Sequence, residues 1–319
     1  MGRRQKVLFV LRIVVSVVML TLLLSRIDLS TLLPADRSSA VPWLIAGLVV
    51  MLGAVILATV RWQRVLTALE LPADLPALLS HSLAGMFVAN FLPSTIGGDV
   101  LRVSRLSASN GQAPASFASV VLERLTGFLV LPLLTLFALF THPALLRLGV
   151  ASQLALLFSV GTLVALVGIL ALAANARLGQ RLTENQSWLR FAGAVHLGFH
   201  RIRRHPGAAV SVLATALAYQ VTVVLVAWLA SRSLGIDVGW APVMAFIPVV
   251  AMTQVLPISV NGLGLREGAL VLLLQPLGVE TGQAVALGLV LYGINLVVSL
   301  LGAPAFAVGT RNRPVRAAA

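Results

Sequence analysis

Cysteine is absent from this 319-residue sequence, and acidic residues are scarce, with 10 Asp and Glu against 23 Lys and Arg. The lack of cysteine excludes disulfides and thiolate metal ligands, and it removes any redox clue about the compartment. Charged residues make up 10% of the chain, against about a quarter in soluble domains, whereas hydrophobic residues make up 59%. The composition therefore predicts an all-α polytopic membrane protein, with residues 1–319 forming a single membrane domain.

Sequence motifs of several enzyme classes are also missing. The chain has no Gly-x-x-x-x-Gly-Lys-Ser/Thr loop for ATP, no Gly-x-Ser-x-Gly elbow for a nucleophilic serine, and no His/Glu cluster with metal-ligand spacing. We therefore expect no enzymatic activity, no cofactor and no metal site.

The net charge of +13 is compatible in principle with nucleic-acid binding. However, 22 of the 23 basic residues are arginines, and most of them lie in short loops between apolar stretches rather than on one soluble face. We therefore expect membrane lipids with anionic headgroups as partners, and no nucleic acid.

Six apolar stretches approach the roughly 20 residues that a helix needs to cross a bilayer. The first follows three basic residues and resembles a signal peptide, but no small-residue cleavage site comes after it, so we expect it to remain as a span. The six predicted spans are Val7 to Leu24, Pro42 to Val60, Ser119 to Phe140, Ser152 to Ala173, Pro206 to Ala230 and Gln283 to Ala307.

Two further apolar segments, 78–92 and 242–256, have only 15 residues each. We predict that both are re-entrant, because the chain after the first segment is too polar to cross a bilayer. With a cytoplasmic N-terminus, sixteen basic residues, Arg61 and Arg64 among them, then lie on the cytoplasmic side and four outside. This positive-inside bias predicts an inner-membrane protein with both termini in the cytoplasm.

Each short segment runs into a copy of the same motif. Residues 92–102, LPSTIGGDVLR, align without gaps on residues 256–266, LPISVNGLGLR, with five of eleven positions identical. The same offset aligns span 42–60 with the one beginning at residue 206, and span 119–140 with the one beginning at residue 283. Because three crossings separate the copies, we predict an inverted repeat of residues 1–150 and 151–319. Chance similarity between two apolar sequences is the alternative.

The motif combines residues that suit a phosphate-binding break in a helix. Pro93 and Pro257 stop the incoming half-helix, and the pairs Gly97-Gly98 and Gly262/Gly264 permit a tight turn. We expect Asp99 and Asn261 to cap the outgoing half-helices, with Arg102 and Arg266 near the first turn, so that backbone N–H groups and a guanidinium face one anion. The alternative is structural: the glycines serve packing, Arg102 pairs with Asp99 or Glu123, and Arg266 pairs with Glu267.

Glu123 and Arg124 are placed by the sequence at the opening of a span, as interfacial or as site residues. Asp99, Glu123 and Glu267 are the acids near the predicted cavity, and are the candidates for proton coupling. His81 is expected to be a hydrogen-bonded polar group rather than a proton relay. The predicted substrate-binding residues are Asn90, Ser94, Thr95, Gly97, Gly98, Asp99, Arg102, Glu123, Arg124, Ser259, Asn261, Gly262, Gly264, Arg266 and Glu267.

Residues 90–102, the pair Glu123-Arg124 and residues 256–268 resemble the transmembrane region of lysylphosphatidylglycerol synthase, also called the flippase-like membrane family. The resemblance spans nearly the whole chain. In the full synthase this region precedes a soluble aminoacyltransferase domain and is thought to move aminoacylated phosphatidylglycerol between leaflets. The chain ends soon after its last span, so the resemblance implies lipid translocation without the synthase activity. It does not name the lipid.

Together these features predict a membrane carrier that moves an anionic lipid or a lipid-linked precursor between leaflets, with Arg102 and Arg266 holding the phosphate from opposite sides. Two alternatives remain. One is a non-transporting subunit or scaffold for a glycosyltransferase or lipid-modifying enzyme, with the arginine-rich loop 177–204 as its docking surface. The other is a carrier for small soluble anions.

Overall fold

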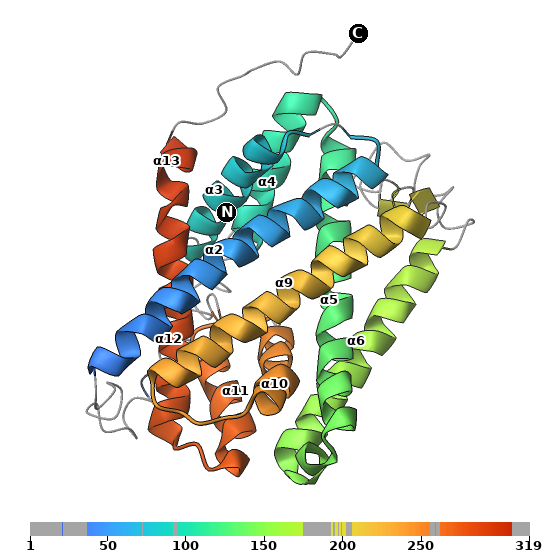
Figure 1. Ribbon diagram of the computed structural model, residues 1–319. Coiled ribbons are helices and arrows are strands. Elements are labelled where there is room, and N and C mark those ends of the chain that lie inside the picture. Colours follow the sequence, from blue (N-terminus) through green and yellow to red (C-terminus); the bar gives the residue numbers. More distant parts are fainter. Residues whose placement is uncertain are drawn as a thin grey trace.

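The computed structural model describes residues 21, 37–71, 73–91, 95–174, 193, 195–196, 198, 200–201, 206–255, 259 and 262–307. Over these ranges the chain is helical and contains no strand (Figure 1). Five helices are long and apolar enough to cross a membrane: α2 (Arg37–Ala68), α5 (Ala113–Thr141), α6 (Val150–Ala174), α9 (Pro206–Ser233) and α12 (Thr281–Leu300). They confirm five of the six predicted spans, while the span predicted at 7–24 lies outside the described residues except for Thr21.

Helices α2 and α9 run antiparallel across the front of the bundle in Figure 1 and share the most extensive contact of any described helix pair. Small residues make this closeness possible. A Cβ added to Gly47 of α2 would touch Leu229 of α9 at 4.0 Å and Ile294 of α12 at 3.3 Å, and Ala54 is fully buried. Without a hydrophobic driving force between helices in lipid, such close backbone packing is what holds spans together.

The first short segment forms a hairpin of helices α3 (Leu75–Phe91) and α4 (Thr95–Asn110), which pack against each other. Contrary to the prediction, Gly97 and Gly98 lie inside α4 and make no turn. Gly98 instead allows the two helices to touch, because a Cβ there would lie 2.4 Å from the carbonyl oxygen of Gly85. Asp99 is likewise not an N-cap, because α4 already begins at Thr95.

The second short segment also forms two packed helices, α10 (Trp240–Thr253) and α11 (Leu265–Leu274). Gly262 and Gly264 have positive φ angles of 75° and 80°, which confirms the predicted backbone turn, since only glycine adopts such angles freely. The N-cap of α11 is Gly264, so the prediction that Asn261, itself outside the described residues, caps this helix is wrong. Glu267 completes the cap by accepting the Gly264 N–H at 2.7 Å.

The two hairpins lie toward opposite ends of the bundle, α3–α4 in the upper part of Figure 1 and α10–α11 in the lower part. The order α2, α3, α4, α5 matches the order α9, α10, α11, α12 in length and character, with two short helices between two spans in each set. An inverted repeat requires this arrangement. The boundaries predicted for the two halves, 1–150 and 151–319, stay a prediction.

The last predicted span, 283–307, is not continuous. Helix α12 ends at Leu300, and a separate short helix α13 (Gly302–Ala307) follows and packs on α3. Arg105 of α4 fixes the end of α13 by donating hydrogen bonds to the carbonyl oxygens of Ala305 at 3.0 Å and Phe306 at 3.2 Å. The hairpin α3–α4 is therefore tied to the C-terminal end of the described chain.

Two buried apolar clusters hold the bundle together. The larger joins α5, α6, α9, α10, α11 and α12 around fully buried side chains such as Phe246 and Leu270. The smaller, around Trp62 and Leu66 of α2, lies under the α3–α4 hairpin. Two 3-10 turns, η2 (Pro143–Arg147) and η3 (Gln275–Leu277), connect α5 to α6 and lead from α11 toward α12.

Candidate functional site

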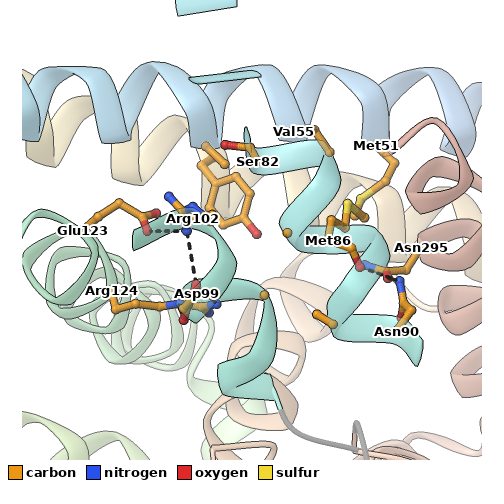
Figure 2. Close-up of a pocket in the computed structure, with 15 residues that line it drawn as sticks. Met51, Val55, Ser82, Met86, Asn90, Asp99, Arg102, Glu123, Arg124 and Asn295 are labelled. Atoms are coloured by element: carbon orange, nitrogen blue, oxygen red, sulfur yellow. Dashed lines mark hydrogen bonds and ion pairs between the residues drawn. The ribbon is translucent and has the colours of Figure 1, made fainter. Parts of the chain in front are cut away.

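A cavity of about 300 Å³ lies between α2, α3, α4, α5, α9 and α12 (Figure 2). One end is lined by charged side chains from α4 and α5, and the other by an asparagine pair from α3 and α12. Met51 and Val55 of α2 and Met86 of α3 add an apolar wall. The lining therefore offers charge, amide groups and hydrocarbon surface within a single space.

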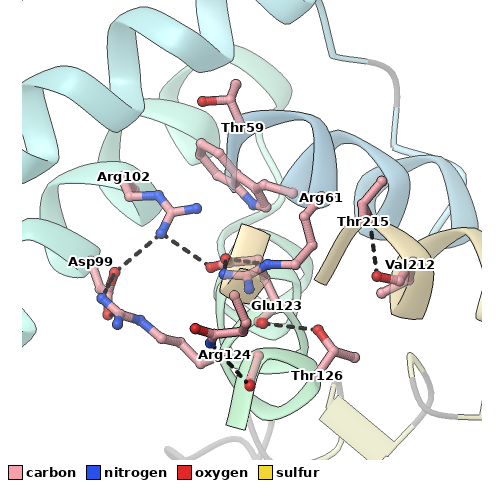
Figure 3. Close-up of polar contacts among 12 residues, drawn as sticks. Thr59, Arg61, Asp99, Arg102, Glu123, Arg124, Thr126, Val212 and Thr215 are labelled. Atoms are coloured by element: carbon pink, nitrogen blue, oxygen red, sulfur yellow. Dashed lines mark hydrogen bonds and ion pairs between the residues drawn. The ribbon is translucent and has the colours of Figure 1, made fainter. Parts of the chain in front are cut away.

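The charged end is a connected ion-pair network (Figure 3). Glu123 of α5 accepts hydrogen bonds from Arg61 of α2, with Nε at 2.9 Å, and from Arg102 of α4, with Nη1 at 3.2 Å. Asp99 of α4 accepts from Arg124 of α5 at 3.0 Å through both carboxylate oxygens, and from Arg102 at 3.3 Å. Arg102 thus joins the two carboxylates into one network.

The network carries an excess of positive charge, with three guanidinium groups and two carboxylates. Glu123 is 2% exposed and Arg61 is 5% exposed. Charges at such depth are costly to bury unless they are paired and have a function. In the part of the chain that the structure describes, the buried Nη1 of Arg61 and Nε of Arg102 have no hydrogen-bond partner.

Aromatic rings support the arginines. The guanidinium of Arg102 lies 4.1 Å from the centre of the Trp62 ring, and that of Arg61 lies 4.7 Å from the centre of the Tyr219 ring. Such a contact with an aromatic ring orients the planar guanidinium without neutralising its charge. Tyr219 is the 14th of the 28 residues of α9, so the network lies near the middle of that helix.

The sequence places Arg61 and Glu123 in this network through two long helices. Helix α2 extends to Ala68, beyond the predicted end at Val60, so Arg61 is inside the bundle rather than in a cytoplasmic loop. Helix α5 begins at Ala113, so Glu123 and Arg124 lie within it and do not open it, which corrects that prediction. Gly127 makes room for Arg61, because a Cβ there would lie 2.8 Å from Arg61 Nη1.

The opposite end of the cavity is uncharged. Asn90, in the last turn of α3, donates through Nδ2 to Oδ1 of Asn295 on α12 at 3.1 Å (Figure 2). This hydrogen bond joins the α3–α4 hairpin to a span of the other predicted half. A pair of amides offers both donors and acceptors to hydroxyl or carbonyl groups of a ligand.

The second motif does not line this cavity. Arg266 donates to Oε1 of its neighbour Glu267 at 3.1 Å from Nε and 2.8 Å from Nη2, and its guanidinium lies 5.3 Å from the centre of the Tyr292 ring. Tyr292 is one turn before Asn295 on α12. Both local pairings of the structural alternative, Arg102 with its acids and Arg266 with Glu267, are therefore present.

The cavity brings together six of the predicted binding residues: Asn90, Gly98, Asp99, Arg102, Glu123 and Arg124. Gly97 belongs to the start of α4 and is not among the lining residues, and Thr95 begins α4 with its side chain outside the described part of the structure. Ser259, Gly262, Gly264, Arg266 and Glu267 lie at the second break, and Ser94 and Asn261 lie outside the described residues.

Four polar residues of the site were not predicted. Arg61 was assigned to a cytoplasmic stretch, although a tryptophan beside it was a sign of burial. Ser82, Tyr219 and Asn295 line the cavity, and the signal for Asn295 was an amide inside a strongly apolar span. The buried Nδ1 of His81, a residue expected to be hydrogen-bonded, has no partner in the described ranges. Within those ranges no group of His, Asp and Glu could hold a metal ion.

The sequence model of the lysylphosphatidylglycerol synthase TM region family matches residues 9–302. The chain belongs to this family. No curated protein and no solved structure matches it. The matched range contains both hairpins and every lining residue of the cavity, so the site is part of this lysylphosphatidylglycerol synthase TM region and not an addition to it.

Proposed function

We propose that this member of the lysylphosphatidylglycerol synthase TM region family is a carrier that moves an anionic lipid, or a lipid-linked phosphate, between the leaflets of a bacterial inner membrane, without an enzymatic step. The observation that carries the proposal is the cationic network in a cavity that also has an apolar wall. These two features match the two parts of a phospholipid. The phosphate binds to cationic donors, and the acyl chains pack against hydrocarbon surface.

The charged end suits a phosphate in geometry as well as in sign. Arg102 and Arg124 approach the same carboxylate, Asp99, so their N–H groups already converge on one anionic position. Guanidinium groups bind phosphate oxygens through paired hydrogen bonds, and the low polarity of a buried site strengthens those bonds. The amides of Asn90 and Asn295 then meet the polar part of the headgroup beyond the phosphate.

The two hairpins provide a route for alternating access. Helices α3 and α4 line the cavity. They lie toward one end of the bundle, and α10 and α11 occupy the other end (Figure 1). Separation of Asn90 from Asn295 opens the space between α3 and α12. Arg266, which stacks on Tyr292 one turn from Asn295, receives the headgroup on the far side. In this proposal Arg102 and Arg266 bind the headgroup one after the other and not at the same time. Both termini lie in the cytoplasm.

Lipid movement by purified protein in liposomes tests the proposal. The wild-type protein is expected to expose a fluorescent phosphatidylglycerol of the inner leaflet to an impermeant quencher, and to leave phosphatidylcholine largely in place. Arg102→Gln should reduce the rate at least about tenfold, the scale of one lost charge-assisted contact. Arg147→Gln, which removes an exposed arginine far from the cavity, is the matched control.

Equal rates for Arg102→Gln and wild type would contradict the proposal. So would the absence of any lipid movement by folded wild-type protein. If that protein instead co-purified in fixed ratio with a glycosyltransferase or lipid-modifying enzyme, a scaffold role would replace the carrier. Uptake of a water-soluble anion with no dependence on lipid headgroup would make it a carrier for small anions.

A further inference from the structure

We propose that Asp99 is an internal substitute for the ligand's phosphate: it occupies the anion position while the cavity is empty and leaves that position when the headgroup binds. The inference rests on the proposed function and adds the regulation of the same site. It assigns to Asp99 a role opposite to that of a binding residue, because Asp99 competes with the ligand.

The contacts of Asp99 are those that a bound phosphate would make. Both of its carboxylate oxygens accept from Arg124 at 3.0 Å, and one also accepts from Arg102 at 3.3 Å (Figure 3). Two guanidinium groups from different helices thus converge on one small anion that lines the cavity. A phosphate diester carries the same single charge and offers oxygens at a similar spacing.

Glu123 cannot play this part, because it is fixed in place. It is 2% exposed, and Arg61 holds it through both Nε and Nη2 while Arg102 binds its other oxygen. The Asp99 side chain is 21% exposed, against 3% for that of Glu123. Of the two carboxylates of the network, Asp99 is therefore the one that can move.

The exchange keeps the charge of the network constant. With Asp99 in place, three guanidiniums and two carboxylates give a formal charge of +1. When a phosphate diester replaces Asp99, the sum is again +1. An empty network without Asp99 would hold +2; the Arg124 side chain is 48% exposed, but those of Arg61 and Arg102 are 7% and 11% exposed, so the added uncompensated charge is unfavourable. Asp99 therefore stabilises the empty carrier and, by the same contacts, weakens ligand binding and promotes release.

The network disfavours a headgroup that carries an additional ammonium, because its formal charge stays positive after the exchange and Glu123 remains paired with Arg61 and Arg102. The site as built therefore favours headgroups with hydroxyl groups and net negative charge over aminoacylated or zwitterionic ones.

Binding of a short-chain phosphatidylglycerol to the purified full-length protein in detergent tests the inference. Asp99→Asn keeps the shape of the side chain and removes its charge, and should lower the Kd at least about tenfold, as expected when a competing charge is lost from a close pair. Asp99→Glu keeps the competitor and should bind no tighter than wild type. Asp74→Asn, which removes an exposed acid at the start of the same hairpin, is the matched control and should leave the Kd unchanged.

A second readout separates competition from a structural effect. In liposomes, Asp99→Asn should move phosphatidylglycerol more slowly than wild type although it binds it more tightly, because release is slowed. If Asp99→Asn does not fold, Asp99→Ser takes its place with the same expectation. Titration with glycerol 3-phosphate distinguishes the two sources of phosphate: tighter binding of both ligands by Asp99→Asn supports exchange with any phosphate, and tighter binding of phosphatidylglycerol alone supports exchange with a lipid.

The binding results distinguish failure of this inference from failure of the proposed function. If wild type binds phosphatidylglycerol and folded Asp99→Asn binds it equally or more weakly, the inference is overturned and the proposed function stands. If neither the wild type nor any Asp99 variant binds phosphatidylglycerol or glycerol 3-phosphate, both are overturned. Tighter binding by Asp99→Asn, with unchanged binding by Asp74→Asn and no tighter binding by Asp99→Glu, is the result that supports it.

Discussion

Arg61 and Glu123 are 62 positions apart in sequence and form a buried ion pair that ties α2 to α5, with Arg61 Nε donating to Glu123 Oε1 at 2.9 Å. Arg102 also donates to this carboxylate, from Nη1 to Glu123 Oε2 at 3.2 Å. The ion pair therefore fixes one wall of the cavity and holds Glu123 away from the anion position that Asp99 occupies.

Removal of one partner of this ion pair should lower the stability of the folded protein. Arg61→Ala leaves a buried carboxylate with one fewer cation, and loss of a partner from a buried pair typically costs about 3–5 kcal/mol. We expect a clear fall in the apparent melting temperature of the protein in detergent. Arg64→Ala, three residues along α2 at an exposed position, is the control and should melt like wild type. A melting temperature for Arg61→Ala equal to that of Arg64→Ala would show that the pair does not stabilise the bundle.

The contact between Gly85 and Gly98 sets the position of Arg102. Gly98→Ala places a Cβ within 2.4 Å of a backbone oxygen that cannot move aside, so α3 and α4 must separate. Overpacking of this kind costs about 1–3 kcal/mol. The variant should be less stable and should move lipid more slowly.

Gly53→Ala in α2 is the matched control, since a Cβ there meets nothing within 4 Å. It should be neutral or slightly stabilising, by up to about 1 kcal/mol from helix propensity. A stable and fully active Gly98→Ala protein would show that the hairpin does not depend on this close approach.

Much of the fold follows from residue patterns that lie within single segments. Runs of about 20 apolar residues predicted five spans that the structure confirms, and two 15-residue segments with polar ends predicted the two hairpins. The positive φ angles of Gly262 and Gly264 were foreseen because a broken helix needs them. Arg102, Asp99 and Glu123 were expected to lie together, because a re-entrant segment packs against the span that follows it.

Other features depend on contacts between distant segments, and no local pattern carries them. In the sequence Arg61 resembles a topology-determining arginine, but in the structure it pairs with Glu123 of α5. In the sequence Gly98 resembles a turn glycine, but in the structure it packs against Gly85 of α3. Asn295 meets Asn90 across the two predicted halves. For the same reason, Asp99 and Asn261 were wrongly expected to be helix caps, since where α4 and α11 begin depends on the packing around them.

The hydrogen bond between Asn90 and Asn295 predicts that a covalent link between α3 and α12 at this place stops lipid movement. The chain has no native cysteine, so Asn90→Cys and Asn295→Cys can be combined and joined by oxidation or a short thiol cross-linker. If α3 must leave α12 for the headgroup to pass, the cross-linked protein should stop moving lipid, and a reductant should restore the movement after disulfide formation. Each single substitution under the same treatment is the control. Full lipid movement with the cross-link intact would contradict the opening of the cavity at this place.

The most direct test of the account is to find where the headgroup binds. A phosphatidylglycerol with a photoreactive group on its glycerol can be cross-linked to the protein in lipid nanodiscs and mapped by mass spectrometry. The account predicts cross-links to the cavity face of α3, between Ser82 and Asn90, and to α5 near Glu123, all of them lost in Arg102→Gln. Cross-links confined to the lipid-facing surfaces of the spans, and unchanged in Arg102→Gln, would contradict it.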